Sequence, residues 1–182
     1  MLFNSIDFAL FIPIVFTIYW LFKNQLHTQN LIILISSYVF YAWWDVRFLA
    51  IIGFSTIIDF FVGILLLKSS NSNRRKLLLV VSLIVNLGLL AFFKYFNFFA
   101  ENFTAAFTFF GSNFSIDSLN IVLPVGISFY TFQTMSYTID IYRNKLKPTN
   151  NFISFAAFVS FFPQLAAGPI ERASNLLPQF FQ

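Results

Sequence analysis

Long apolar runs separated by short polar gaps make up most of the 182-residue chain. A helix needs about 20 mostly apolar residues to cross the hydrocarbon core of a bilayer. The pattern therefore predicts an all-α, polytopic transmembrane fold, with one membrane domain over the whole chain. The first run lacks the positive start and cleavage site of a signal peptide, so we expect it to be retained. Five runs are expected to span the membrane, at residues 8–22, 31–44, 48–67, 77–93 and 121–142.

Two further segments do not fit a simple crossing. Residues 94–120 alternate phenylalanine with small and polar residues, and residues 111–113 form a turn-like Gly-Ser-Asn sequence. We interpret this stretch as an interfacial amphipathic segment followed by a loop. Residues 152–167 are apolar but interrupted by Pro163. A broken segment is expected to re-enter the membrane or to lie along its interface.

Composition supports a membrane protein over a soluble domain. The chain is 58% hydrophobic and 10% charged, with mean hydropathy +0.77, whereas soluble domains carry about 25% charged residues. So few charges cannot cover a surface that faces water. There is no cysteine, which excludes disulfides, thiolate metal sites and cysteine nucleophiles. No cluster of metal ligands is found, so no metal site is expected.

Basic residues in alternate gaps predict the orientation. One set of gaps holds eight Lys and Arg residues and the other holds two, Arg47 and Lys94. The positive-inside rule then places the richer set in the cytoplasm and the N-terminus outside, in a membrane crossed several times. The net charge is +4, but the basic residues lie in the gaps between apolar runs, where they set the topology. No nucleic acid partner is therefore expected. The eight are Lys23, Lys68, Arg74, Arg75, Lys76, Arg143, Lys145 and Lys147.

Polar residues inside the predicted spans need a reason, because burying them in hydrocarbon costs a few kcal/mol. Asp59 lies near the middle of the third span, and small polar neighbours share its side of the helix. Asn86 and Ser82, four residues apart, form a similar seam on the fourth span. Two interpretations remain for these seams, hydrogen bonding between helices or a pathway through the membrane. The neighbours of Asp59 are Ser55, Thr56 and Gly63.

The fifth span has a polar face whose members lie within about 80° of one another on a 3.6-residue helix. Such a face lines either a protein core or a wet cavity, and four polar groups exceed what helix association usually needs. Asp140 has a second interpretation, an ion pair with Arg143 one turn later. The polar face consists of Tyr130, Gln133, Tyr137 and Asp140, opposite Phe132, Met135 and Ile139.

No enzyme motif accompanies this pattern. The chain lacks the P-loop, the zinc-protease H-E-x-x-H motif and the G-x-S-x-G nucleophile motif. Its single histidine, His27, is expected to be a solvated residue of the first cytoplasmic loop. The residues alone therefore indicate a polytopic membrane protein with a polar interior face.

Two segments, LPVGISFYTFQTMSYTIDIYR at 123–143 and FAAFVSFFPQLAAGPIERASNLLPQ at 155–179, closely resemble the membrane-bound O-acyltransferase family. The likeness is to its bacterial branch that acetylates exopolysaccharides such as alginate. The start of the chain, MLFNSIDFALFIPIVFTIYW, and the run SSYVFYAWW resemble that branch too. The phrase GPIER followed by LLPQ is the most specific part.

The resemblance implies transfer of an acetyl group from coenzyme A or a carrier-protein thioester in the cytoplasm to an extracytoplasmic polysaccharide. It also places the protein in a bacterial inner membrane, with a ring of helices around a thin central region where a tunnel joins the two sides. Periplasmic acetyl-transfer partner proteins and no bound cofactor are implied as well. The family's essential histidine, a general base, lies on a later helix. His27 does not match it, so we expect an N-terminal portion that lacks the catalytic part and is inactive alone. No catalytic residue is assigned within this chain.

Glu171 and Arg172 of the GPIER phrase follow a turn that Gly168-Pro169 is expected to fix. They either hold the tunnel mouth and orient the base, or form an ion pair that stabilises the turn. Gln133 and Tyr137 are the preferred tunnel-lining residues.

Two other functions compete with polysaccharide acetylation. One is D-alanyl transfer to teichoic acid, within the same family. The other is a transporter or export subunit, in which Asp59 and Asp140 would carry an ion. Transporters often contain an internal repeat, and none is found between residues 1–90 and 91–182.

Overall fold

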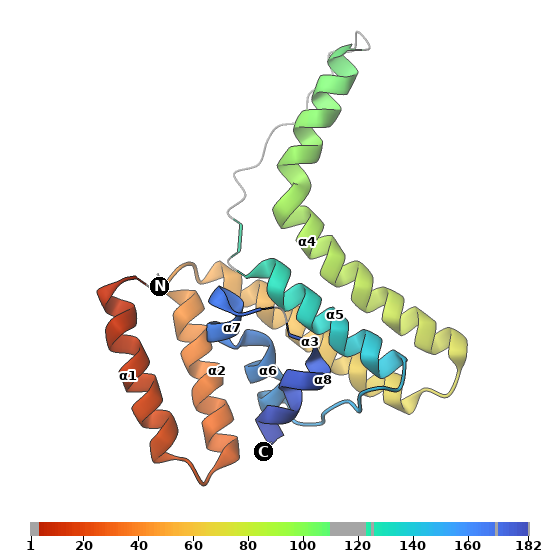
Figure 1. Cartoon of the computed structure of the whole chain (residues 1–182). Helices are drawn as coiled ribbons and strands as arrows, with labels where there is room; N and C mark the ends of the chain where they lie inside the picture. The colour runs from red at the N-terminus through yellow and green to blue at the C-terminus, as the bar shows by residue number, and fades with distance from the viewer. Residues whose placement is uncertain (1–3, 110–122, 125, 170, 182) are drawn as a thin grey trace.

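The computed structural model describes residues 4–109, 123–124, 126–169 and 171–181, and every element in these ranges is helical. The all-α prediction is confirmed. Figure 1 shows α1 and α2 as an antiparallel pair beside a bundle of α3, α5 and the first half of α4. The helices are α1 Ile6–Leu21, α2 Leu26–Ala42, α3 Arg47–Lys68, α4 Ser72–Phe109, α5 Ile127–Tyr142, α6 Phe152–Ser160, α7 Phe162–Ala167 and α8 Ala173–Leu176, followed by the 3₁₀ helix η1, Leu177–Phe181.

Helix α2 begins five residues earlier than its predicted span at 31–44. The reason is that two polar residues of its first turns, Gln29 and Asn30, are buried against other segments rather than solvated. His27 lies in the first turn of this helix and is exposed. The prediction that His27 belongs to a loop is therefore wrong, although its exposure is as expected.

Helix α4 is 38 residues long, so the predicted end of the fourth span at residue 93 is not a helix end. No glycine or proline lies between Gly88 and Gly111 to stop the helix. In Figure 1 the helix changes direction part-way, and its second half projects away from the other helices. The second half forms most of the segment predicted to be interfacial. The predicted turn at 111–113 lies outside the described residues.

Helix α5 starts at Ile127 and not at the predicted residue 121. Pro124 lacks an N–H and restricts its own backbone, and Gly126 has φ +75°, which is left-handed and incompatible with a helix. Gly126 instead caps the helix, and its carbonyl accepts from the Tyr130 N–H at 3.1 Å. The start of α5 is thus set by backbone chemistry, not by where the apolar run begins.

The apolar stretch 152–167 is broken, as its proline predicts. Phe161 ends α6 and begins α7, and Pro163 lies in the first turn of α7, where its missing N–H costs nothing. After α7 the chain turns back through α8 and η1 to lie beside α6. Asn30 joins the two arms, donating to Ser154 Oγ at 3.0 Å and to the Phe180 carbonyl at 2.7 Å. We call the segment 152–181 the C-terminal hairpin.

Arg75 fastens the ends of three helices together. Its Nη1 donates to the Leu66 carbonyl at 2.7 Å, near the end of α3. Its Nη2 donates to the Tyr142 carbonyl at 2.7 Å and to Asn144 Oδ1 at 2.9 Å, at the end of α5. The last carbonyls of a helix lack partners within it and carry partial negative charge, so a guanidinium is a fitting cap. A residue that sequence reasoning used only for topology therefore has a structural role.

The other end of α3 carries a surface ion pair. Arg47 Nη2 lies 2.7 Å from Asp45 Oδ2, and Asp45 also accepts from the Arg47 backbone N–H. These hydrogen bonds hold the pKa of the Asp45 carboxyl below its usual value. Both side chains are solvent-accessible, so the pair orders the α2–α3 connection more than it stabilises the fold.

Two helices, α3 and α4, are long and apolar enough to cross a membrane by length and composition. The apolar helix α1 and the stretch 152–166 are shorter. Many large apolar side chains are exposed, and α1 has no buried residue at all. Helix α5, in contrast, has nine buried residues, and most of them carry a polar atom. Together with the apolar composition, this distribution fits a membrane protein.

Candidate functional site

A buried polar network joins α3, α4 and α5, and Asp59 of α3 lies at its centre with none of its surface exposed. Ser82 of α4 donates to Asp59 Oδ1 at 2.5 Å, and Asn86 Nδ2 donates to Asp59 Oδ2 at 2.8 Å. Both carboxyl oxygens are therefore held by side chains of the neighbouring helix. The seams predicted on the third and fourth spans lie directly against each other.

Asn86 extends the network to α5. Its Oδ1 accepts from Ser55 Oγ at 2.8 Å and from Thr134 Oγ1 at 3.1 Å, while its Nδ2 also donates to the Ser82 carbonyl at 3.0 Å. Thr138 of α5 lies 3.1 Å from Ser82 Oγ. Each helix contributes polar atoms, and each atom of Asn86 is satisfied. Buried polar groups without partners are costly, so a network this complete fixes the packing of the three helices.

The four residues of the predicted polar face on α5 are all buried, at 0–9% exposure. Tyr137 stacks against Phe155 of α6 with ring centroids 4.6 Å apart, and it lies so close to Gly63 that a Cβ there would come within 2.7 Å of its hydroxyl. Gln133 donates to the Phe158 carbonyl at 3.0 Å. Tyr130 is buried at 2% exposure. In the described part of the chain these side chains fill a protein core, and tunnel lining by them stays a prediction.

The alternative role given to Asp140, an ion pair with Arg143, is not present; among the described residues the single salt bridge is Asp45–Arg47. The helix ends two residues after Asp140, and the Asp140 backbone carbonyl accepts from the Lys145 and Leu146 N–H groups at 2.8 and 3.3 Å. This reversal of the chain carries Arg143 to an exposed position on the outside of the turn.

A pocket of about 470 Å³ with both apolar and polar lining residues lies beside the GPIER segment. Most of its lining comes from the C-terminal hairpin, and several lining side chains end in an amide or carboxyl group. Phe161 and Pro163, at the break between α6 and α7, form its apolar wall. The other lining residues are Gln164, Gly168, Pro169, Glu171, Asn175, Leu176 and Gln179. We call this space the hairpin pocket.

Both ends of the Gln164 side-chain amide, in the hairpin pocket, have hydrogen-bond partners. Its Nε2 donates to the Pro169 carbonyl at 3.3 Å, across the turn. Its Oε1 lies 3.5 Å from Gln133 Nε2 on α5, and only 8% of the residue is exposed. Gln133 thus reaches the pocket indirectly, by holding the amide that lines it.

Glu171 lines the hairpin pocket, and its Oε2 accepts a long hydrogen bond of 3.5 Å from Asn175 Nδ2. Arg172 is exposed, and its backbone carbonyl accepts from the Asn175 and Leu176 N–H groups to begin α8. The two side chains form no ion pair in the described structure, so the prediction of a structural Glu171–Arg172 pair is wrong. The Glu171 carboxylate instead accepts from Asn175, and Arg172 caps α8 through its backbone.

Sequence reasoning missed most of the hairpin pocket. Gln164, Asn175 and Gln179 were not singled out, because isolated amides after a proline give no periodic signal. Thr134 and Thr138, four residues apart on α5, were also missed. Their spacing matches that of Ser82 and Asn86, so the same i to i+4 test would have found them.

Where the structure describes the chain, no three His, Cys, Asp or Glu side chains come together to hold a metal ion. The polar chemistry of these regions consists of amides, hydroxyls and single carboxyl groups. Such groups orient ligands through hydrogen bonds.

Relatives of the chain are bacterial O-acetylases. Over 182 residues it is 40% identical to the probable alginate O-acetylase AlgI of Pseudomonas aeruginosa, covering 99% of this chain and 34% of that protein. The probable AlgI of Pseudomonas putida is 41% identical over 184 residues, with 37% of its length covered. The peptidoglycan O-acetyltransferase of Helicobacter pylori is 34% identical over 209 residues, with 38% covered. The chain spans about a third of the length of these relatives. No family profile and no solved structure matches it.

Proposed function

We propose that this chain, a member of the membrane-bound O-acyltransferase family by its homology to these O-acetylases, forms the N-terminal part of an enzyme that acetylates an extracytoplasmic polysaccharide. The observation that carries the proposal is the identity of about 40% to probable alginate O-acetylases over 99% of the chain. The hairpin pocket adds support, because Gly168, Pro169 and Glu171 of the GPIER segment line it.

The reaction is the transfer of an acetyl group from a thioester to a hydroxyl group. The hydroxyl oxygen attacks the thioester carbonyl carbon, its proton passes to a general base, and the carbon–sulfur bond breaks. The sulfur leaves as a thiol after taking up a proton, and the acceptor leaves as an ester. In this family the base is a histidine on a later helix, beyond the chain described, and such a base contributes about 10²–10⁴-fold to the rate.

The residues described would then form one wall of the reaction chamber. Amide groups both donate and accept hydrogen bonds, which suits a thioester carbonyl or a sugar hydroxyl. Gln164 is the strongest candidate for such contacts, since Pro169 and Gln133 hold its side chain in place. Glu171 lies at the same pocket and serves as a second contact. Arg172 is not assigned a contact with substrate.

The proposal includes a membrane arrangement in which the basic turns face the cytoplasm and the N-terminus faces outward. The C-terminal hairpin then enters from the cytoplasmic side with α6 and returns there with η1. Asn30 supports this course, because it ties the first turn of α6 to the end of η1. A cytoplasmic donor, acetyl-coenzyme A or an acyl carrier, would reach the hairpin pocket without crossing the membrane.

Alginate-type exopolysaccharide is favoured as the acceptor because the identity is higher to the alginate O-acetylases than to the peptidoglycan enzyme, 36–41% against 34%. The two acceptors are separable by where the acetyl esters appear. Ester content of secreted polysaccharide and of purified peptidoglycan should be measured in cells with and without the gene. Loss of esters from peptidoglycan alone would contradict the favoured acceptor.

The pocket role is tested in the full-length protein within its own bacterium. Gln164→Leu should lower polysaccharide acetylation at least about tenfold, the cost of one or two lost hydrogen bonds in a transition state. Gln25→Leu is the matched control, since Gln25 is exposed and outside the pocket. Immunoblots of membranes should show equal protein for both variants. Normal acetylation by the Gln164 variant would remove this residue from the proposed site.

A further inference from the structure

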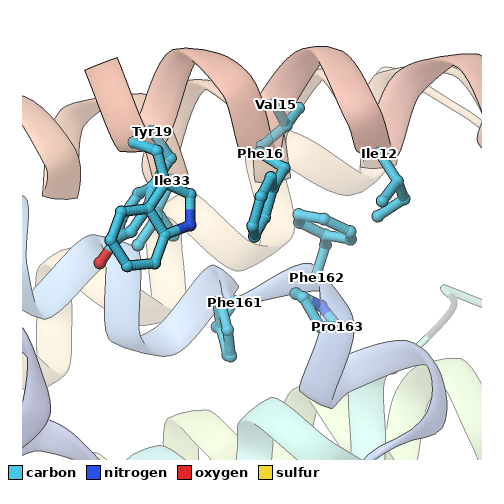
Figure 2. Close-up of a pocket in the computed structure, with 9 residues that line it drawn as sticks. Ile12, Val15, Phe16, Tyr19, Ile33, Phe161, Phe162 and Pro163 are labelled. Atoms are coloured by element: carbon cyan, nitrogen blue, oxygen red, sulfur yellow. The ribbon is translucent and has the colours of Figure 1, made fainter. Parts of the chain in front are cut away.

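A second pocket lies between α1 and the C-terminal hairpin, and its lining is almost entirely apolar. It measures about 300 Å³, and its walls come from α1, from Ile33 of α2 and from the junction of α6 with α7. In Figure 2, Phe16 extends from α1 toward Phe161 and Phe162. The lining residues are Ile12, Val15, Phe16, Tyr19, Trp20, Ile33, Phe161, Phe162 and Pro163. We call it the α1 pocket.

Helix α1 touches its neighbours near its two ends and leaves the middle open. Near its start, Phe11 packs on Phe162 with ring centroids 5.5 Å apart. Near its end, the Tyr19 carbonyl accepts from Gln29 Nε2 at 3.4 Å. Between these contacts runs the α1 pocket, from Ile12 to Trp20, which is about 12 Å along a helix. The space is thus elongated along α1, as a hydrocarbon chain requires.

The two ends of α1 carry opposite charge. Asp7 lies in the first turn, and Lys23 follows the last turn, with its N–H donating to the Trp20 carbonyl at 3.3 Å. Lys23 is exposed and lies one turn beyond the aromatic end of the α1 pocket, formed by Tyr19 and Trp20. Aromatic residues favour the headgroup region of a bilayer, and a lysine there attracts an anionic phosphate. The Tyr19, Trp20 and Lys23 end of the pocket is therefore the end that suits a lipid headgroup, and the other end suits the tail.

We propose that the α1 pocket binds one acyl chain of an anionic phospholipid, with the tail along α1 and the headgroup phosphate at Lys23. The inference rests on membrane insertion but not on the acetyltransferase activity. Phe161 and Pro163 line both the α1 pocket and the hairpin pocket. The bound tail packs against the α6–α7 break, as a structural lipid.

Photocrosslinking in the full-length protein tests the site in its native membrane. p-Benzoyl-phenylalanine replaces Phe16, which lines the pocket, or Ile14, which is 58% exposed on another face of α1 and does not line it. After irradiation, mass spectrometry identifies the lipids attached to each position. Relative to position 14, position 16 should be enriched about fivefold in anionic over zwitterionic phospholipid, the preference one lysine gives. Lys23→Gln should remove the enrichment, and Lys23→Arg should keep it.

Three outcomes would overturn the proposal. Equal lipid ratios at positions 14 and 16 would mean that only bulk lipid touches the pocket. Enrichment that survives Lys23→Gln would mean that the headgroup is not bound at Lys23. Crosslinks from position 16 to the protein itself would mean that another polypeptide segment fills the space. Because acetylation is not the readout, these results are independent of the proposed function.

Discussion

Helices α1 and α5 are both sixteen residues long, but the more apolar helix, α1, is exposed and the more polar helix, α5, is buried. Helix α1 is almost wholly apolar and has no buried residue. Helix α5 carries hydroxyl, amide and carboxyl groups and has nine buried residues. In a water-soluble protein the apolar helix would be the buried one. The contrast indicates that the solvent of this fold is lipid, and that polar groups must find partners inside the protein.

The contrast has a simple physical cause. Hydrocarbon is as apolar as a leucine side chain, so burying α1 against protein gains little in a membrane. A polar group has no partner in hydrocarbon, so Asn86 and Thr134 gain by facing each other across α4 and α5. Helix α5 contacts α3, α4 and α6, and its Gln133, Thr134 and Thr138 side chains meet polar atoms of α4 and α6 there. The following changes test this contrast, from the largest effect to the smallest.

Asn86→Leu should cause the largest loss of stability. It removes the group that joins Asp59, Ser55 and Thr134, and leaves a buried carboxyl without one of its donors. We expect a loss of about 3–5 kcal/mol in the free energy of unfolding. Denaturant titration of the full-length protein in mixed micelles measures it. On α1, Thr17→Val is the matched change, because Thr17 bonds only within its own helix and is exposed; it should cost less than about 0.5 kcal/mol. Equal losses would contradict the comparison.

Gly63→Ala should be the next most harmful change. An added Cβ would lie 2.7 Å from the Tyr137 hydroxyl and 2.9 Å from its ring, and Tyr137 is locked against Phe155. Overpacking of this kind costs about 1–3 kcal/mol. Gly53→Ala on the same helix is the control, since nothing lies within 4 Å of its added Cβ. The free energy of unfolding of both variants is measured by denaturant titration. Equal losses for the two variants would contradict the close packing of α3 on α5.

Arg75→Lys should weaken the end of the bundle where α3, α4 and α5 meet. Lysine keeps the charge but not the planar fork that contacts Leu66, Tyr142 and Asn144. A loss of about 1–2 kcal/mol is expected from the unpaired carbonyls. Arg74→Lys is the control, because the Arg74 side chain is exposed. Hydrogen exchange at the last turn of α5 should speed up only in the Arg75 variant. Unchanged exchange there would contradict the role of Arg75 in joining the helix ends.

Leu10→Ala on α1 should have the smallest effect. Leu10 is 63% exposed, so in lipid its truncation exchanges one apolar surface for another. The loss should stay under about 0.5 kcal/mol, whereas Phe155→Ala in the core should cost about 3–5 kcal/mol. Thermal unfolding in micelles distinguishes the two. A large effect at position 10 would mean that α1 is packed against protein after all.

The helical class and the approximate centres of α1 to α5 followed from the sequence, because apolar runs and helical periodicity are local signals, although several helix ends did not. The same holds for the Asp59 and Asn86 seams, whose members repeat every three or four residues. Periodicity told us which residues of α5 share a face, but not what covers that face. Whether Tyr137 meets water or Phe155 depends on a segment 18 residues later, so the sequence left cavity and core equally open.

Other features were beyond local patterns for identifiable reasons. The length of α4 was missed because a fall in hydropathy after residue 93 was interpreted as a helix end, although no residue there stops a helix. The role of Arg75 depends on carbonyls of two other helices, which no side-chain pattern records. Gln164 matters because the turn at Gly168 brings Pro169 back to it. Each of these requires the tertiary arrangement.

The central claim is that the apolar helix α1 faces lipid while the polar helix α5 is buried in protein. Its most direct test is the collision rate of a spin label with oxygen and with a water-soluble nickel chelate. The chain contains no cysteine, so single labels at positions 14 and 134 can be placed in the full-length protein once any other cysteines are removed. We predict that the label on α1 collides freely with oxygen and rarely with nickel, as in lipid. The label on α5 should be immobile and reached by neither. Access of nickel to position 14, or of oxygen to position 134, would contradict the account.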